Sequence, residues 1–421
     1  MLKENKKSPV APLGAVRRSL ASLETAENRR QFIAMAKVNI AHVEAGNTPG
    51  QAKGVVRIPV ENYLDPQRWE REVALFRTLP LMLALGGELR GPHSYKAMTV
   101  MDVPVLLTRG ADGEARAFIN SCSHRGAVIV EDGIGTARRF SCPYHNWTYD
   151  GLGDLVGVTD REFFGTVDLD TLGLTPLPVA ERAGLIFVTL TPGATMDIDE
   201  HLHGYDKVLD FFGFGDWHLI SSRPVQGPNW KIAYDGYLDF YHLPFLHRKT
   251  FGTEISNKPI YDAWGPHQRM MSPDPGLLRL RGVPEDEWPM DAMCGGVWTI
   301  FPHISFAGGN GGGLISQLFP GKEPGSSVTL QNYFTSTEPS GEERTSAMGK
   351  ADFLEAVVRD EDYFTGLRLQ RALATGAKEH VIFGRNEGGG QRFHTLLGQM
   401  LDAPTDAAAQ AGDQPVNISM R

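Results

Sequence analysis

Two pairs of cysteine and histidine constrain this chain more than any other feature of its sequence. One residue separates Cys122 from His124, two separate Cys142 from His145, and seventeen lie between the pairs. Each pair therefore offers one thiolate and one imidazole. This division suits a two-iron cluster with unlike irons, since in a Rieske [2Fe-2S] centre two histidines replace two cysteines on one iron and raise the reduction potential. The pattern predicts an electron-carrying cluster.

Two other uses of these residues fit the pattern less well. A zinc site also takes two cysteines and two histidines, but its usual spacing groups like with like, whereas here the two types alternate. A disulfide between Cys122 and Cys142 needs an oxidising compartment, and nothing in the chain indicates export. The chain has three cysteines in 421 residues, which is cytosolic usage, and we expect Cys294 to fill core space.

The composition is that of a globular protein with an acidic surface. Hydrophobic residues make up 41% and charged residues 22% of the chain, which is long enough for two domains with separate cores. The formal net charge of −9 argues against a nucleic-acid partner. The apolar run at residues 79–85 is far short of the roughly 20 residues that cross a bilayer. We expect no membrane partner and a cytoplasmic location.

The residue pattern divides the chain into five parts. Residues 1–55 are expected to form an N-terminal helical extension, and residues 56–95 a helix that leads into the first strands and packs on the domain at residues 196–402. Residues 96–195 show short β-like runs between turns, which predict a small antiparallel β domain. Residues 196–402 mix helix-like and strand-like stretches irregularly, which is typical of α+β domains. Residues 403–421 are expected to be a flexible tail.

Several elements can be placed more closely. The β-like runs of the small domain lie at residues 103–107, 117–119, around 140 and 185–190. The helix-like stretches lie at residues 17–43, 203–212, 230–245 and 350–375. The later strand-like stretches lie at residues 297–306, 313–319 and 327–336. The glycine-rich residues 308–313 lack the βαβ context of a nucleotide-binding loop, so we expect a turn there.

Three more potential metal ligands, Asp239, His242 and His247, crowd into the predicted helix at residues 230–245 and just beyond it. Asp239 and His242 are three positions apart and would share one helix face. His247 would point away from that face on a regular helix, but Pro244 predicts a kink or an end that lets it swing back. Two histidines and a carboxylate form the site of oxygen-activating non-haem Fe(II) enzymes. A helix with solvated histidines is the alternative.

The residues around the cysteine–histidine pairs carry a family resemblance. Residues 124–127 read His-Arg-Gly-Ala, and residues 144–153 read Tyr-His-Asn-Trp-Thr-Tyr-Asp-Gly-Leu-Gly. This region resembles the Rieske domain of the ring-hydroxylating oxygenases, and Arg125 and Trp147 also match. The resemblance implies that the two cysteines hold one iron of the cluster and the two histidines hold the other.

Residues 229–247 also look like a motif of the same family, the one that carries the two histidines of a mononuclear iron. By this match His242 and His247 bind the iron, whereas Asp239 orients a ligand and does not bind the metal. The chain departs from the family's pattern at one place, because Asp235-Gly236 stands where Glu-Asn is usual. We expect this difference to tune the site without inactivating it.

The third iron ligand is expected within residues 359–364. Asp362 is favoured, because Glu361-Asp362 with Gln370 eight residues later resembles the carboxylate helix of the family. Asp360 remains a candidate, but it would face nearly the opposite side of a helix from Asp362, so only one of the two can reach the iron. A run of three acids is otherwise most often a solvated helix face.

The resemblance covers roughly residues 60–400 and implies the rest of the expected protein. Its fold would be α+β, with a small antiparallel β Rieske domain and a helix-grip catalytic domain, in which a curved antiparallel sheet wraps a long helix. It would be the terminal oxygenase alpha subunit, using O2, a [2Fe-2S] cluster and a mononuclear Fe(II). A ferredoxin, a flavin reductase or both would supply electrons, so that NAD(P)H acts only indirectly. A homotrimer, or an assembly of three alpha and three beta subunits, would let Asp239 bridge His242 to His145 of the partner subunit.

The expected substrate is an aromatic or other hydrophobic small molecule, which would be mono- or dihydroxylated. Residues near the metal segment and in one strand-like run are expected to line an apolar cavity, although ordinary sheet core is the alternative for each: Phe240, Leu243, Trp298, Phe301 and Ile304. Oxidative N- or O-demethylation is the alternative reaction. A Rieske electron carrier without oxygenase activity is a further alternative, and so is a zinc-stabilised binding protein, but neither needs the second group of ligands.

Overall fold

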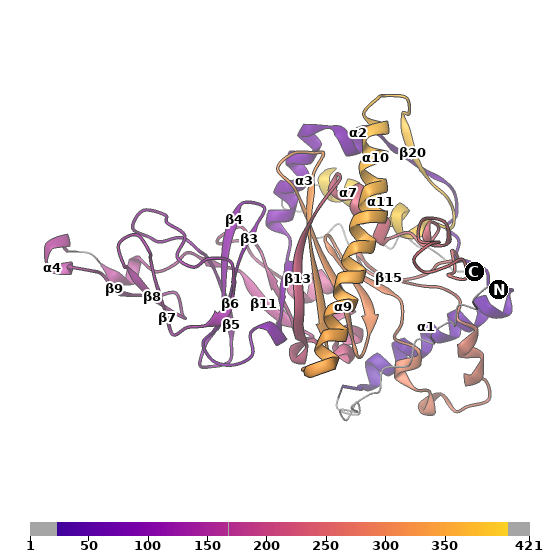
Figure 1. The fold of residues 1–421 in the computed structure, drawn as a ribbon, viewed down its shortest axis with the longest axis horizontal. Coiled ribbons are helices and arrows are strands. Elements are labelled where there is room, and N and C mark those ends of the chain that lie inside the picture. The colour runs from indigo at the N-terminus through magenta and orange to yellow at the C-terminus, as the bar shows by residue number, and fades with distance from the viewer. Residues whose placement is uncertain (1–22, 167, 403–421) are drawn as a thin grey trace, which may run out of the picture.

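The computed structural model describes residues 23–166 and 168–402, which form an elongated molecule (Figure 1). Small sheets occupy one end, and a large sheet with helices packed on it occupies the other. The strand pairs of the described residues are antiparallel. This mixture of helices and antiparallel sheets confirms the expected α+β class.

The small end contains two sheets with short strands. A five-stranded sheet has the order β10-β5-β4-β3-β6, with bounds Pro176–Leu177, Ala115–Ile119, Val103–Arg109, Ser94–Val100 and Gly133–Thr136. A three-stranded sheet has the order β7-β8-β9, with bounds Arg139–Ser141, Thr148–Asp150 and Leu155–Gly157. Phe118, Phe140 and Tyr149 from both sheets pack into one core with Cys122 and Cys142. The sheets therefore hold both cysteines on a shared apolar base.

The large end is built on a seven-stranded sheet, in which six consecutive strands form a meander and the first strand closes one edge. Its order is β13-β19-β18-β17-β16-β15-β14, with bounds His218–Gly227, Ser327–Thr335, Gly312–Pro320, Ile304–Gly309, Val297–Ile300, His267–Met271 and Ile260–Trp264. Helix α9 (Gly341–Val357) packs on β13 and β19, and α7 (Trp230–Tyr237) on β18 and β19. Figure 1 shows α9 crossing this sheet.

A long helix runs from α9 into α10 (Phe364–Leu373) through η9 (Val358–Tyr363), a π-helical turn. The other helices are α1 (Ala26–Glu44), α2 (Glu61–Leu64), α3 (Pro66–Thr78), α4 (Arg161–Phe164), α5 (Ile198–Leu202), α6 (Tyr205–Leu209), α8 (Leu243–Leu246) and α11 (Gly388–Asp402). Two small sheets complete the fold, β11-β12-β2 (Val179–Arg182, Leu185–Val188, Leu81–Leu85) and β1-β20 (Val56–Pro59, His380–Phe383). None of the helices in the described ranges is long and apolar enough to span a bilayer.

The N-terminal part packs on the large end. Thr25 caps α1, whose Phe32 and Met35 enter a core cluster with Trp298. The predicted helix at residues 17–43 is thus observed from Ala26, while its first residues and the expected tail at residues 403–421 lie outside the described residues.

Two expected elements were wrong in extent. The predicted helix at residues 230–245 is two helices, because α7 ends at Tyr237 and α8 begins only at Leu243. The predicted strand at residues 297–306 is two antiparallel strands, β16 and β17, with a tight turn between them. Glycine-rich residues 308–313 form the hairpin turn between β17 and β18, as expected.

Candidate metal centres

The two cysteine–histidine loops have the same backbone construction. In the first loop Cys122 N–H donates to Ala127 O at 2.9 Å, and Gly126 N–H donates to Cys122 O at 2.7 Å. In the second loop Cys142 N–H donates to Trp147 O at 2.8 Å, and Asn146 N–H donates to Cys142 O at 2.9 Å. Gly126 and Asn146 both have left-handed backbone angles, φ 76° and 58°. This shared turn places the two cysteines at corresponding positions, while His124 lies two residues after its cysteine and His145 three residues after its own.

The loops place the two predicted histidine ligands side by side and put both predicted cysteine ligands in one core cluster. The ring centroids of His124 and His145 are 4.6 Å apart, and Cys122 and Cys142 are each 3% exposed and free of disulfides. The Nδ1 atom of His124 is buried and has no hydrogen-bond partner among the described residues. A buried ring nitrogen without a partner is unfavourable unless something binds it, so the donor set fits a cluster that takes imidazole nitrogen and cysteine sulfur.

Aromatic groups enclose this site. The ring of His124 stacks on Trp147 at 4.9 Å, and Phe164 contacts both rings edge-on at 5.4 Å. The Tyr149 hydroxyl lies 3.3 Å from Cys122 Sγ, and burial raises the pKa of Tyr149 to about 12. Tyr149 therefore stays protonated and can donate a hydrogen bond to a sulfur, which favours a more negative, reduced cluster.

His242, His247 and Asp362 converge at the large end. Their ligand atoms all lie within 4.8 Å of one another, and Asp362 Oδ1 is 3.5 Å from His242 Nε2 and 3.3 Å from His247 Nε2. Burial acts against a charged His242, but hydrogen bonds to Asp239 and Asp362 raise its pKa to about 9. The reverse interaction holds the pKa of Asp362 below its usual range despite its burial. Two imidazoles facing one carboxylate are a donor set that suits a divalent iron.

Asp239 contacts His242 through a turn and not along a helix face, which corrects the prediction. Helix α7 ends at Tyr237, and the Asp239 carboxylate accepts a hydrogen bond from Tyr241 N–H, a turn that short polar side chains favour. Asp239 Oδ2 is 3.0 Å from His242 Nδ1. Pro244 does not kink a long helix, since it occupies the first turn of α8, where proline is well tolerated.

A second carboxylate, which the sequence did not reveal, orients the other histidine. Glu361 Oε2 is 2.6 Å from His247 Nδ1, and Thr250 donates a hydrogen bond to the other Glu361 oxygen. Each histidine therefore has its own carboxylate on the nitrogen that faces away from Asp362, an arrangement that fixes the ring orientation of metal ligands. Asp360, the alternative third ligand, is exposed, is paired with Arg359 at 2.8 Å and is not among the ligand atoms that converge.

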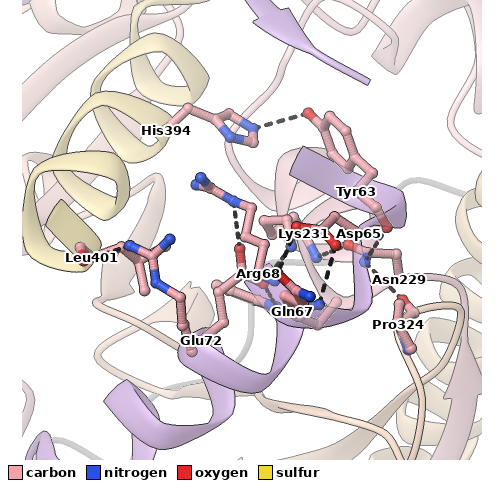
Figure 2. A network of polar contacts seen from close by, with 12 residues as sticks. Tyr63, Asp65, Gln67, Arg68, Glu72, Asn229, Lys231, Pro324, His394 and Leu401 are labelled. Carbon is pink, nitrogen blue, oxygen red and sulfur yellow. Dashed lines mark hydrogen bonds and ion pairs between the residues drawn. The ribbon is translucent and has the colours of Figure 1, made fainter. Parts of the chain in front are cut away.

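The start of α7 is held by a buried network of polar contacts (Figure 2). Glu72 of α3 is fully buried and accepts hydrogen bonds from Arg68 Nε at 3.0 Å, from Trp230 Nε1 at 2.8 Å and from Lys231 Nζ. Asn229 caps α7 by accepting from Lys231 N–H at 2.9 Å. The residues Asn229, Trp230 and Lys231 thus fix the helix that leads to Asp239.

Asp235, where the chain departs from the family's pattern, makes two polar contacts with buried side chains. Asp235 accepts from the Tyr63 hydroxyl at 2.9 Å and lies 2.9 Å from Nε2 of His394, a residue of α11. Figure 2 shows His394 and Tyr63 pointing toward each other. The shorter carboxylate therefore still ties α7 to α2 and α11. Gly236 leaves open space, since a Cβ there would meet nothing within 4 Å.

The structure separates the residues that were expected to line one apolar cavity. Phe240 and Phe301 belong, with half-buried Leu243, to a core cluster around Trp230. Trp298 and Ile304 belong to the other large cluster, which contains Phe32 of α1. Neighbouring residues of a strand point to opposite faces, so one strand-like run does not supply a single lining. Trp298 instead packs in the core, over the buried Arg269 guanidinium at 4.7 Å.

Comparison with known families assigns both halves of the chain. The Rieske [2Fe-2S] domain matches residues 81–166, and the catalytic domain of the ring-hydroxylating alpha subunit matches residues 204–403. The oxygenase subunit of carnitine monooxygenase from Escherichia coli (strain K12) is 27% identical over 367 residues, which cover 82% of this chain and 93% of the relative. The alpha subunit of 2-aminobenzenesulfonate 2,3-dioxygenase from Alcaligenes sp is 30% identical over 216 residues, which cover 48% and 54%.

Solved structures share the fold. A quaternary ammonium Rieske monooxygenase in complex with L-carnitine has a TM-score of 0.68 at 21% identity, covering 83% of this chain and 96% of that one. Naphthalene 1,2-dioxygenase from Rhodococcus sp. bound to indole has a TM-score of 0.65 at 17% identity, covering 90% and 100%. The chain therefore belongs to the Rieske non-haem iron oxygenases, with both domains of their alpha subunits, and its cofactors are a Rieske [2Fe-2S] cluster and a mononuclear iron.

Proposed function

We propose that this chain is a terminal oxygenase that hydroxylates a small organic molecule with O2 and electrons from a separate reductase. The observation that carries the proposal is the convergence of His242, His247 and Asp362 within 4.8 Å, in the same chain as a Rieske domain. In this proposal those three residues hold the mononuclear iron. Cys122, Cys142, His124 and His145 hold the cluster.

The residues around the iron would orient its ligands. An iron held by His242, His247 and Asp362 would supply the activation of O2, and a Rieske cluster would supply electrons one at a time. Asp239 and Glu361 each accept a hydrogen bond from the Nδ1–H of one histidine, so that both Nε2 atoms are presented to the metal. An electron carrier without oxygenase chemistry would have no need for this second arrangement.

We infer that the working protein is a trimer in which electrons cross between subunits. Figure 1 places β7 and β8, which flank the second cluster loop, at the opposite end of the molecule from α7. Large apolar side chains are exposed near both sites, with Tyr144 59% exposed at the cluster and Phe245 69% exposed beside His242. In the trimer Asp239 would hydrogen-bond His145 of the partner subunit and link the two centres.

The substrate is proposed to be small and to carry an amine or ammonium group. A relative that aligns along 82% of this chain is the oxygenase subunit of a carnitine monooxygenase, and others are named for choline, glycine betaine and anthranilate. Three carboxylates at the iron site, Asp239, Glu361 and Asp362, would favour a cation nearby. This favours oxidative N-demethylation or another oxidation beside nitrogen. Hydroxylation of an aromatic or other hydrophobic compound is the second candidate, supported by the naphthalene dioxygenase fold.

The electron donor is proposed to be a ferredoxin, a flavin reductase or both, and the protein is proposed to work in the cytoplasm.

The test of the proposed bridge is Asp239→Asn, with Asp360→Asn as a control that removes the same charge from an exposed residue outside the ligand group. The wild-type protein and both variants should bind about three irons per chain, from the ligand count. Turnover should be abolished in Asp239→Asn alone. Full activity of this variant would refute the bridging role.

The substrate class is tested by a screen with a reconstituted reductase and product mass analysis. L-Carnitine, choline, anthranilate and naphthalene separate the two candidates. Oxidised products from L-carnitine or choline would support the amine-oxidising function, and a dihydroxylated naphthalene product would support the second candidate. Iron-loaded protein that lacks the low-average-g signal of a reduced Rieske cluster in EPR would contradict the oxygenase assignment itself.

A further inference from the structure

Tyr237 and Tyr363 join the two segments that supply the proposed iron ligands. Tyr237 is the last residue of α7, two positions before Asp239, and Tyr363 ends the π-helical turn η9 directly after Asp362. Their hydroxyl oxygens are 3.2 Å apart. This contact is separate from the histidine–carboxylate contacts, so it can fix the geometry of the site before a metal binds.

The contact is one link in a buried chain of hydrogen bonds that ends on the large sheet. The Tyr363 hydroxyl lies 2.5 Å from Thr329 Oγ1 on β19, and Gln331 Nε2 donates to the Tyr237 hydroxyl at 3.0 Å. Ser316 on β18 then donates to Gln331 Oε1 at 2.9 Å. Thr329, Gln331, Ser316 and Tyr363 are all 2% exposed or less. Both segments are therefore anchored to the same two strands.

Breaking this chain of hydrogen bonds would be costly, because four of its five members are buried away from water and only Tyr237 is half-buried. A buried hydroxyl without a partner costs more than an ordinary hydrogen bond contributes. The ring of Tyr363 is also wedged against Gly227 of β13, where an added Cβ would lie 3.0 Å from the ring. The ring therefore has little freedom to move.

The π-helical turn η9 links the anchored Tyr363 to the proposed iron ligand Asp362. Such turns are rare, and they occur mostly as single turns at functional sites. Here the turn directs Asp362 to the histidines while its neighbour Tyr363 reaches the sheet. We propose that Tyr237 and Tyr363 are positioning residues, whose hydroxyl contact holds Asp362 at the distance from His242 and His247 that an iron requires.

This inference rests on the proposed iron site, and its test uses Fe(II) itself as the probe. Tyr237→Phe, Tyr363→Phe and the double variant each keep the rings and remove only hydroxyls. The matched control is Tyr333→Phe, which removes a hydroxyl that takes no part in the chain, from a half-buried residue of the same strand β19. Fe(II) affinity is measured anaerobically by competition with a chelator, and ligand geometry by EPR of the ferrous site with nitric oxide added.

We expect each single variant to bind Fe(II) about tenfold more weakly and to show an altered nitric oxide signal, as for other partners of metal ligands. The double variant should bind Fe(II) no more weakly than the single variant with the lower affinity, since both hydroxyls act through one contact. The control should match the wild type. Unchanged affinity and an unchanged signal in both single variants would overturn the proposal, even if their thermal stability fell.

The remaining outcomes of the experiment also decide for or against the proposal. If Tyr363→Phe fails to fold, Thr329→Val removes the far anchor of the same chain and is expected to weaken Fe(II) binding in the same direction. Additive losses in the double variant would show two independent roles and would also overturn the proposal. If the wild-type protein gave no ferrous nitric oxide signal, the proposed iron site would fail. A normal wild-type signal with unaffected variants would contradict only the positioning role of Tyr237 and Tyr363.

Discussion

The two proposed metal centres of this chain are built in opposite ways. The cluster residues lie in two loops, each closed by its own backbone hydrogen bonds between a cysteine and a residue four or five positions away. The mononuclear site joins a turn after α7 to the π-helical turn η9, and the contact between His247 and Glu361 spans 114 positions. The first centre is thus specified locally, whereas the second depends on the packing of the whole large end.

The difference shows where each centre is vulnerable. A local loop keeps its shape as long as its own hydrogen bonds and its apolar base remain, so changes elsewhere should leave it intact. In a site assembled from distant segments, a change in any supporting element can displace the ligands. Here those elements are α3, α7, η9 and the large sheet. Variants of the large end should therefore weaken the mononuclear iron and spare the cluster.

The largest expected effect comes from removing one ligand at each centre. In Cys142→Ser we expect the cluster to be lost, which leaves about one iron per chain, and turnover to stop because electrons cannot enter. In Asp362→Ala we expect the two cluster irons to remain and the third to be lost. Iron determination with EPR of the reduced protein checks both. Loss of all iron in either variant would contradict the independence of the two centres.

The next effect tests the buried network that holds α7. Glu72→Gln leaves the buried Lys231 and the partly buried Arg68 without a full counter-charge, so we expect the free energy of unfolding to fall by about 3 kcal/mol or more. Chemical denaturation of the large end, followed by tryptophan fluorescence, measures it. Asp112→Asn, which breaks an exposed pair with Arg116 at the same spacing, should change little. The cluster EPR signal should be unaltered in both.

The sequence revealed the local centre more fully than the distant one. The spacing of Cys122, His124, Cys142 and His145 predicted the Rieske domain, which the family comparison confirms. At the second site, the short separation of Asp239 and His242 predicted their contact, but not the turn that makes it. No local pattern pairs Glu361 with His247, because only the folded sheet and the long helix bring them together.

The same reasoning explains the errors in the expected elements. The turn formed by Asp239 follows the end of α7 at Tyr237, and an apolar pattern alone does not register such a turn. Trp298 and Ile304 read as part of one apolar strand, but the turn after β16 and the alternation of strand faces send them into a different core from Phe240. The apolar pattern of the sequence predicts helices and strands, whereas the packing of the whole fold determines which residues contact one another.

Glu361→Gln should have a smaller effect, confined to the distant centre. The amide can still contact Thr250, but it lacks the charge that orients His247, so we expect Fe(II) affinity to fall by about 10- to 100-fold. Asp360→Asn, one position away and paired with Arg359, is the control and should bind Fe(II) like the wild type. Equal affinities in the two variants would mean that the Glu361 contact does not orient the ligand.

The smallest expected effect tests what ends α7. A Cβ at Gly236 meets nothing within 4 Å, so Gly236→Ala should stabilise the protein by about 0.5–1 kcal/mol through helix propensity alone. Gly366→Ala in α10 is the control, because its Cβ would lie 2.9 Å from Pro228, and we expect a loss of stability. If glycine alone ends α7, the longer helix of Gly236→Ala would pull Asp239 off His242 and turnover would fall. If the Asp239 turn ends α7, Gly236→Ala should be more stable than the wild type and its turnover should be unchanged. We expect this outcome, because the contacts of Asp235 and the turn at Asp239 hold the same segment.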